Sequence, residues 1–349
     1  MKFDFVIGNP PYQEEAPGQS TSDKPVYHLF MDAASSVGDV VELVTPARFL
    51  FNAGATPKKW NEKMLLDKHF RILLYEQDAT AIFPGTFITG GIAISTYNKN
   101  KEYKPIRIFV PYAKLRSIIE KVENISSNSL NNIISGRTPY LFTDALHKQY
   151  PNAITLLSKG HKYDISSNAF QSLPDIFLQS TPYNKDEYYR CLGRKENQRV
   201  YCWIKKEFAK GRLSDYVTKW KVFLPKANGA SGMLGKNAAR LISKPVVGEP
   251  NDIATDTFIC VGTCDTKFEA TAIYKYVLSK FARALLGTLK VTQINSKETW
   301  ANVPLQDFTP NSDIDWSKPI PQIDQQLYKK YGLDQSEIDF IETHVKEMA

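Results

Sequence analysis

The chain has 349 residues, a formal net charge of +7, 42% apolar residues and 12% aromatic residues. This balance excludes a disordered or fibrous protein, and at about 150 residues per domain the length predicts two folded units. The sequence shows no basic segment followed by an apolar core and no run near the roughly 18 apolar residues of a membrane helix, so we expect a cytoplasmic protein without a membrane partner.

The first hundred residues alternate short apolar runs with amphipathic segments. Residues 3–8 predict a buried strand that stops at Asn9-Pro10-Pro11, where consecutive prolines break the pattern. By the same reasoning, further strands are predicted at 39–51, 70–77 and 92–99, and helices at 25–37 and 58–69. Apolar strands separated by helices predict an α/β fold with a largely parallel sheet that is covered on both faces.

The pattern changes after residue 101 to short β-rich pieces joined by Asn/Ser-rich connectors. We therefore predict one domain at residues 1–115 and a second, α+β domain at 116–349. Within the second, residues 269–287 predict one amphipathic helix that ends at Gly287. Residues 334–349 predict another helix, with Asp334 or Ser336 near its cap.

The charge is unevenly distributed along the chain. Residues 1–100 contain nine basic and eleven acidic side chains, whereas residues 185–244 contain fifteen basic and five acidic ones, with aromatic residues between them. Such a window favours a polyanionic partner, although a solvated surface over a Tyr/Trp core is the alternative. The candidate DNA contacts are Arg190, Arg194, Lys195, Arg199, Lys205, Lys206, Lys210, Arg212, Lys221 and Lys226.

The strongest chemical signal is the tetrad Asn9-Pro10-Pro11-Tyr12, directly after the first strand. Two prolines fix the backbone and remove two N–H donors, so the Asn9 side-chain oxygen and a main-chain carbonyl can together accept hydrogen bonds from an amino group. Tyr12 adds a flat aromatic surface, which suits a planar, amino-bearing ring. The alternative is a structural Asx-Pro-Pro turn with Tyr12 packed over it.

At these residues the sequence resembles the adenine-N6 DNA methyltransferases, in particular the Eco57I-like methylases of restriction-modification systems. FDFVIGNPPYQ is similar to their catalytic motif IV, VELVTPARFLF to the following strand, and IFPGTFITGGIAISTYNK to the motif VIII region. The C-terminal half is similar, more diffusely, to their target-recognition portion. The resemblance implies a partial Rossmann-like methyltransferase sheet followed by an α+β target-recognition domain.

The resemblance also implies roles for individual residues. Asn9 and the carbonyl of Pro10 would accept hydrogen bonds from the amino group of a flipped adenine, with Pro11 completing the rigid tetrad. Tyr12 would stack on the extruded base. Phe83 stands where related enzymes place a second aromatic side chain, with an ordinary core phenylalanine as the alternative.

One departure from the family concerns the cofactor, S-adenosylmethionine. The family's glycine-rich cofactor turn lies upstream of the tetrad, yet only eight residues precede Asn9, and no GxGxxG occurs in the chain. The glycine-rich stretch at 228–236 lacks the strand-turn-helix context. We therefore expect the C-terminal part of a methylase, as a fragment, a truncated product or half of a split enzyme. Such a chain would be inactive alone and need a separate cofactor-binding polypeptide.

Other chemistries find little support in the sequence. The four cysteines predict buried free thiols, the five histidines lie far apart, and we expect no metal site. No nuclease constellation is apparent, so an endonuclease would be a separate polypeptide. The predicted function is adenine-N6 methylation of double-stranded DNA in a restriction-modification system. The alternatives are a non-catalytic DNA-specificity module with a vestigial tetrad and an RNA or protein methylase fragment.

Overall fold

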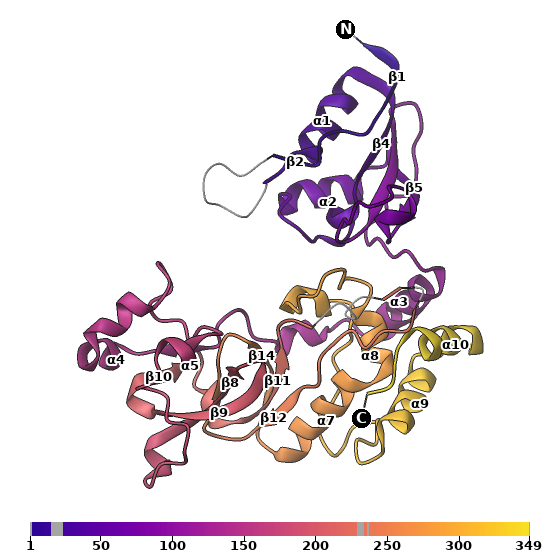
Figure 1. Cartoon of the computed structure of the whole chain (residues 1–349). Coiled ribbons are helices and arrows are strands. Elements are labelled where there is room, and N and C mark those ends of the chain that lie inside the picture. Colours follow the sequence, from indigo (N-terminus) through magenta and orange to yellow (C-terminus); the bar gives the residue numbers. More distant parts are fainter. Residues whose placement is uncertain (1, 15–23, 229–233, 236, 349) are drawn as a thin grey trace. The chain divides into compact units, whose positions relative to one another are not determined.

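A computed structural model describes residues 2–14, 24–228, 234–235 and 237–348 of the chain (Figure 1). The chain divides into two compact units, one of residues 1–116 with 288–292 and one of residues 117–287 with 293–349. Both combine helices with small sheets, so the predicted α/β class is confirmed. Within the described part of the chain, no helix combines the length and apolar character needed to cross a bilayer.

The first unit is built on a four-stranded sheet in the order β1-β4-β6-β5. Its elements are β1 (Phe3–Gly8), β4 (Gly38–Pro46), β5 (Phe70–Glu76), β6 (Ile92–Asn98), the short pair β2 (Gln13–Glu14) and β3 (Lys24–Pro25), and the helices α1 (Tyr27–Val37) and α2 (Lys58–Leu66). Strands β1 and β4 are parallel, whereas β6 is antiparallel to both β4 and β5. The prediction of a largely parallel sheet is therefore wrong for two of the three pairings, because β5 and β6 are joined without a crossover helix.

The second predicted strand is shorter than expected. Residues 39–51 were expected to form one strand, but β4 ends at Pro46 and residues Ala47–Phe51 form a 3-10 turn. Pro46 has no N–H to donate to a neighbouring strand, which favours the end of the ladder at this position. The chain consequently turns inward after Pro46, and Phe49, Leu50 and Phe51 are buried.

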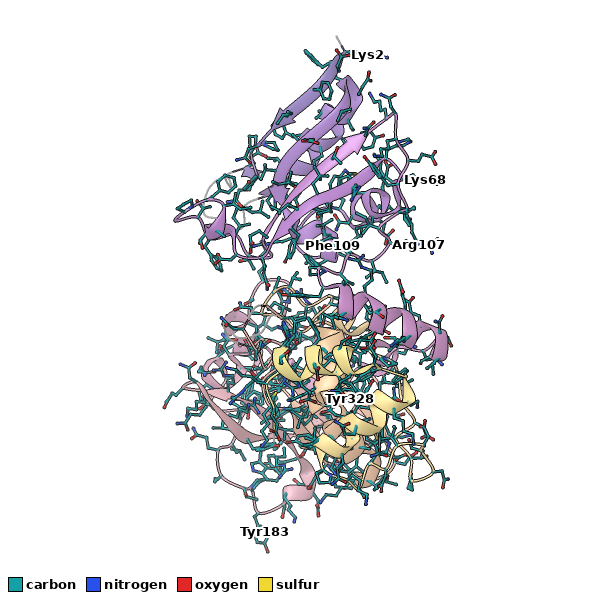
Figure 2. All side chains as sticks on the ribbon, turned by 90° about the vertical axis from the view of Figure 1, so that its right-hand side faces the viewer. Lys2, Lys68, Arg107, Phe109, Tyr183 and Tyr328 are labelled. Carbon is teal, nitrogen blue, oxygen red and sulfur yellow. The ribbon has the colours of Figure 1, made fainter. Side chains whose placement is uncertain are left out.

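Both helices of the first unit pack on the same face of the sheet. Tyr27 and Met31 of α1 and Met64 of α2 share one core with Val41 and Leu43 of β4. On the opposite face no helix of this unit covers the strands among the described residues, as Figure 2 shows. The prediction of a sheet covered on both faces is therefore wrong.

Strand β1 exposes apolar side chains on the uncovered face of the sheet. Its alternate residues Phe3, Phe5 and Ile7 point to the open face and are 45%, 69% and 78% exposed, so the predicted burial of this strand is also wrong. In the described part of the sheet, β1 is an edge strand that pairs only with β4. An apolar strand with an unpaired edge is a ready template for another strand.

The second unit contains three small sheets, in the orders β12-β11-β14, β13-β8-β9 and β10-β7. The strands are β7 (Tyr140–Phe142), β8 (Tyr188–Lys195), β9 (Gln198–Lys205), β10 (Ala209–Gly211), β11 (Trp220–Pro225), β12 (Val246–Gly248), β13 (Asp252–Ala254) and β14 (Phe258–Cys264). The helices are α4 (Asp144–Gln149), α5 (Ala169–Ser172), α6 (Asp215–Thr218), α7 (Lys267–Leu278), α8 (Lys280–Leu286), α9 (Ile320–Lys330) and α10 (Gln335–His344). The division between the units falls within α3 (Ala113–Ile125).

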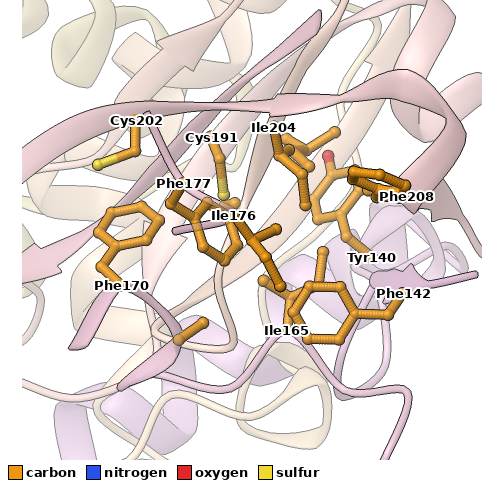
Figure 3. Close-up of a cluster of buried hydrophobic side chains, with 14 of the residues drawn as sticks. Tyr140, Phe142, Ile165, Phe170, Ile176, Phe177, Cys191, Cys202, Ile204 and Phe208 are labelled. Atoms are coloured by element: carbon orange, nitrogen blue, oxygen red, sulfur yellow. The ribbon is translucent and has the colours of Figure 1, made fainter. Parts of the chain in front are cut away.

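Aromatic and sulfur-containing side chains fill the core between β7, β8 and β9 (Figure 3). Phe170 and Phe177 pack against each other with ring centroids 4.9 Å apart. Cys191 and Cys202 lie in the same core, and all four cysteines of the chain are buried free thiols. This core holds the β8–β9 hairpin in place from one side.

The long helix predicted at 269–287 is in fact two helices. The chain is extended at Ser279, whose side chain accepts a hydrogen bond from the Ala282 N–H and so caps α8. The buried carboxylate of Asp324 accepts the N–H groups of Lys280 and Phe281, at 3.0 and 2.9 Å. These acceptors satisfy the free donors at the start of α8, which permits the break. At α10 the cap is Asp334, in a reciprocal capping box with Glu337.

Candidate functional site

The tetrad Asn9-Pro10-Pro11-Tyr12 lies at one edge of the sheet in the first unit. Strands β1 and β4 are parallel, so the carboxyl ends of both open on this edge, with Gly8 paired to Leu43. Ligands of α/β sheets bind at such an edge. Beyond the prolines, the Val26 N–H donates to the Tyr12 carbonyl at 3.1 Å and ties the tetrad to the start of α1.

A pocket of about 600 Å³ opens at this edge. Segments after β1, before α1, after β4 and before β6 contribute to it. Its lining residues are Asn9, Pro10, Pro11, Tyr12, Gln13, Pro25, Tyr27, Pro46, Arg48, Gly54, Ala55, Thr86, Phe87, Ile88 and Thr89. The structure therefore brings all four residues of the tetrad to one cavity, with proline, tyrosine and phenylalanine side chains around them.

Two tyrosines in the pocket remain protonated near neutral pH. Burial raises the pKa of Tyr12, and the Asn9 side chain partly opposes this rise. Burial raises the pKa of Tyr27 to about 12, against smaller opposing effects of Thr56 and Arg48. Both phenols are neutral, so the aromatic walls of the pocket suit an uncharged planar ring.

Arg48 is the only charged side chain among the described lining residues. Its Nε donates to the Thr89 carbonyl at 2.6 Å, which fastens the 86–89 segment to the turn after β4. Gly90 has a positive φ of 89°, and a Cβ there would lie 2.8 Å from the Arg48 Cγ. Glycine is thus required for this close approach, and Arg48 positions the segment that carries Phe87.

The predicted second aromatic residue is placed differently by the structure. Phe83 does not line the pocket, whereas Phe87 does and is 82% exposed. The 3-10 turn at Ala79–Ala81 directs the chain so that residues 86–89, and not residue 83, reach the tetrad. Of the two phenylalanines, Phe87 therefore lies at this pocket, and the role predicted for Phe83 stays a prediction.

The predicted DNA contacts all lie in the second unit, and half of them are on β8 and β9, which form a hairpin. Its two-residue turn places Glu196 and Asn197 at φ 50° and 63°, the left-handed conformation that tight hairpins require. Arg194, Arg199, Lys210 and Arg212 are exposed, and Arg190, Lys195, Lys205, Lys206 and Lys226 are half-buried. Lys226 forms an ion pair with Asp256, and Arg212 donates to Thr138.

Lys221 does not belong to this set. Its side chain is fully buried, and its Nζ donates to the carbonyls of Val217, Glu249 and Asp252 at 3.3, 2.9 and 3.1 Å. The prediction that Lys221 contacts DNA is therefore wrong, because the segment around β13 folds over it. Burial lowers the pKa of Lys221 to about 8.

This buried lysine predicts a pH-dependent stability. An unfolded lysine titrates near pH 10.4, so between about pH 8 and pH 10.4 the unfolded state binds more protons than the folded state. We therefore compare the free energy of unfolding of the wild type with that of Lys221→Met. The difference, wild type minus variant, should rise as the pH increases from about 8 to 10.4. Denaturant unfolding of both proteins measures it, and the subtraction cancels the other titrating groups. A flat or falling difference would contradict the burial of a charged amine.

Arg190 is also engaged inside the second unit. Its Nε and one terminal nitrogen donate to the two carboxylate oxygens of Asp252 at 2.8 and 2.7 Å. Its guanidinium lies 4.6 Å from the centre of the Tyr201 ring. The first and largest cause of its raised pKa is the hydrogen bond to Asp252. Arg190 therefore joins β8 to β13.

Two remaining predictions concern other sites. The glycine-rich stretch at 228–236 lies mostly outside the described residues, which include only 228, 234 and 235 of it. Among the residues that the structure describes, no group of His, Cys, Asp and Glu side chains is arranged to hold a metal ion.

Comparison with known proteins bears on the first unit. Residues 1–83 match the family model described as Eco57I restriction-modification methylase. The matched segment contains the tetrad and runs from β1 to β5, which supports a methylase relationship for this part of the chain. A search of curated proteins gave no match.

Among solved structures, one match is the Type IIL restriction-modification enzyme MmeI in complex with DNA. The sequences are 10% identical and the TM-score is 0.43, over 97% of this chain. This chain spans 56% of the length of that solved chain.

Proposed function

We propose that this chain carries the base-holding site and the DNA-recognition unit of an adenine-N6 DNA methyltransferase of a restriction-modification system. The observation that carries the proposal is the tetrad at the shared carboxyl edge of β1 and β4, opening into a pocket with aromatic walls. The match of residues 1–83 to a restriction-modification methylase supports it. In this proposal residues 1–115 form the catalytic part and residues 116–349 the target-recognition part.

The residues of the pocket suit a flipped base. The Asn9 side-chain oxygen and the Pro10 carbonyl accept hydrogen bonds from the exocyclic amino group, which keeps electron density on its nitrogen. The adenine ring lies against Tyr12, with Phe87 as a second aromatic surface at the mouth. Since the lining contains no carboxylate among its described residues, nothing there competes for the amino group as a negatively charged acceptor.

The cofactor of such enzymes, S-adenosylmethionine, supplies an activated methyl group when it is bound. The described pocket residues do not fit this molecule by themselves: they include no acidic side chain for the ribose hydroxyls. The described part of the first unit also shows no glycine-rich turn between a strand and a helix. We therefore propose that residues outside this pocket hold the cofactor.

Strand β1 offers the place where such residues would join. A strand added parallel to its open edge would bring a carboxyl-terminal loop next to Asn9, where the methyl group must arrive. A helix of the same segment, packed on the open face of the sheet, would cover the exposed Phe5 and Ile7. We propose that a cofactor-binding polypeptide segment supplies this strand, in the same protein or in a separate one.

The test is methyl transfer from labelled S-adenosylmethionine to mixed-sequence duplex DNA. The chain is assayed alone and with the product of its upstream genomic neighbour. We expect transfer only in the supplemented reaction, with N6-methyl-2′-deoxyadenosine in the digested product. Transfer by the chain alone would contradict the need for a partner, and N4-methylcytosine would contradict adenine as the target. Salt-sensitive DNA binding without any transfer would favour the non-catalytic specificity module.

Phe87 and Phe83 give a matched pair of variants within this assay. Stacking of an aromatic side chain on a base contributes about 1–3 kcal/mol, so Phe87→Ala should lower kcat/KM for DNA by about tenfold or more. Phe83→Ala removes a ring of the same size, four residues away and outside the pocket, and should change kcat/KM by less than about twofold. Equal losses in both variants would indicate a structural effect on the loop.

A further inference from the structure

A second pocket lies in the recognition unit, at the tip of the β8–β9 hairpin. We call it the hairpin pocket. Its volume is about 740 Å³, and it is bounded by the start of α5, the hairpin turn, the end of β11 and the start of β14. Six of its fifteen lining residues carry amide or guanidinium groups: Asn168, Gln171, Arg194, Asn197, Arg199 and Asn228. The tetrad pocket uses none of these residues.

Two arginines of the hairpin line this pocket side by side. Arg194 and Arg199 are directly opposite in the β8–β9 ladder, and both are exposed. Arg194 donates to the Asn197 carbonyl at 3.3 Å, and Arg199 to the Lys244 carbonyl at 2.6 Å. Neither forms an ion pair with a described residue. Like charges placed opposite each other destabilise a sheet, so the arrangement favours an anion between them.

The acidic residues of the hairpin pocket do not supply that anion. Asp256 is paired with Lys226 and also accepts the Thr138 N–H at 3.1 Å. Glu196 occupies the exposed hairpin turn. The guanidinium groups therefore remain available to a ligand.

Asn228 is the independent sign of a ligand with N–H donors. It is only 6% exposed, and its side-chain oxygen has no hydrogen-bond partner among the described residues. Its backbone N–H donates to the Gln293 carbonyl at 3.0 Å, which fixes the residue without using the side chain. A buried, unpartnered carbonyl oxygen is costly, and a donor from a ligand would satisfy it.

A phosphate can accept hydrogen bonds from the two arginines but has no N–H to donate to Asn228. A base amino group can donate to Asn228 but cannot pair with the arginines. A nucleotide offers both a phosphate and a base amino group. We propose that the hairpin pocket is a nucleotide-binding subsite of duplex DNA recognition, in which Arg194 and Arg199 hold a backbone phosphate and Asn228 reads a base amino group. The choice of duplex DNA over a free nucleotide rests on the proposed function.

The arginine contacts are tested by fluorescence anisotropy with labelled duplexes of mixed sequence at several salt concentrations. Arg194→Ala and Arg199→Ala should each weaken binding by about tenfold and reduce the slope of log K against log salt by about 1. The control is Lys159→Ala, which removes an exposed charge elsewhere on the unit and should leave both quantities unchanged. Arginine variants that bind like the control would overturn the proposal.

Asn228 is tested by selection of bound sequences from a randomised duplex pool. Asn228→Ala should lose base preference at one position while preference at the other positions persists. Its melting temperature should equal or exceed that of the wild type, because the substitution removes an unsatisfied buried group. An unchanged selected sequence would overturn the reading role of Asn228.

Two further outcomes separate this proposal from the proposed function. Binding of adenosine monophosphate that is lost in Arg199→Ala, without any duplex binding, would identify a free-nucleotide site and overturn the DNA assignment. Duplex binding through the hairpin pocket without methyl transfer in the supplemented reaction would leave this subsite standing and overturn the proposed function. Absence of binding to either probe would overturn the subsite.

Discussion

Asn9→Ala is expected to lower methyl transfer by at least about a hundredfold in the supplemented reaction, while binding to duplex DNA stays unchanged. The reason is that the attacking amino group gains positive charge as its bond to the methyl group forms. An acceptor held in place against that group stabilises the developing charge, and removal of one such fixed dipole typically costs about 10²–10³ in rate. Asn9 is exposed on the sheet edge, so its loss should leave the fold intact.

Asn9→Asp is the matched control for this prediction. It preserves the size of the side chain and an acceptor oxygen, so it should retain more activity than Asn9→Ala. Single-turnover rates measure the chemical step, and anisotropy measures DNA binding by the same samples. A parallel loss of DNA binding, or full activity of Asn9→Ala, would remove Asn9 from the proposed site.

The second large effect concerns the stability of the recognition unit. Arg190→Ala is expected to lower the free energy of unfolding by about 2–3 kcal/mol, because it leaves the carboxylate of Asp252 buried and without its cation. That side chain is 4% exposed and would keep the Glu249 N–H at 2.9 Å as a donor. Denaturant unfolding of the whole chain measures the effect.

Two variants separate loss of the ion pair from loss of surface charge. Arg194→Ala removes an exposed arginine from the same strand and should change stability by less than about 0.5 kcal/mol. Arg190→Ala combined with Asp252→Asn also removes the unpaired carboxylate charge, so it should recover part of the lost free energy of unfolding. No difference between Arg190→Ala and Arg194→Ala would contradict the structural role of Arg190.

The elements of the first unit were predictable because their signals are local. Period-two and period-3.6 patterns, together with Pro10, Pro11 and Pro25, place β1, α1, α2, β5 and β6 within a few residues of their observed bounds. The tetrad was recognisable for the same reason, since strand, turn and acceptors lie within ten residues. Whether another element packs against a strand depends on the whole fold and not on the local sequence. The apolar pattern of β1 therefore predicted a buried strand, although this strand is exposed.

The errors in the second unit have a common physical origin. Lys221 and Arg190 look like surface charges in the sequence, but Asp252 of β13, some thirty to sixty positions further on, supplies the carboxylate that binds Arg190 and one of the carbonyls around Lys221. The break at Ser279 likewise depends on Asp324, over forty residues away. That Phe87 and not Phe83 lines the tetrad pocket could not be predicted, because an irregular loop has no period from which to infer the direction of its side chains. The hairpin pocket collects residues from five segments of the chain, and no sequence motif indicates it.

The two-residue turn of the β8–β9 hairpin has a consequence for the thermodynamics of recognition. Glu196 and Asn197 are held in left-handed conformations by an eight-pair ladder, so the backbone at Arg194 and Arg199 is already ordered in the free protein. The conformational entropy of this backbone is lost during folding and not when a ligand arrives. Association at the hairpin tip should thus depend on side-chain and solvent rearrangement alone, without the large unfavourable entropy of a loop that orders on contact.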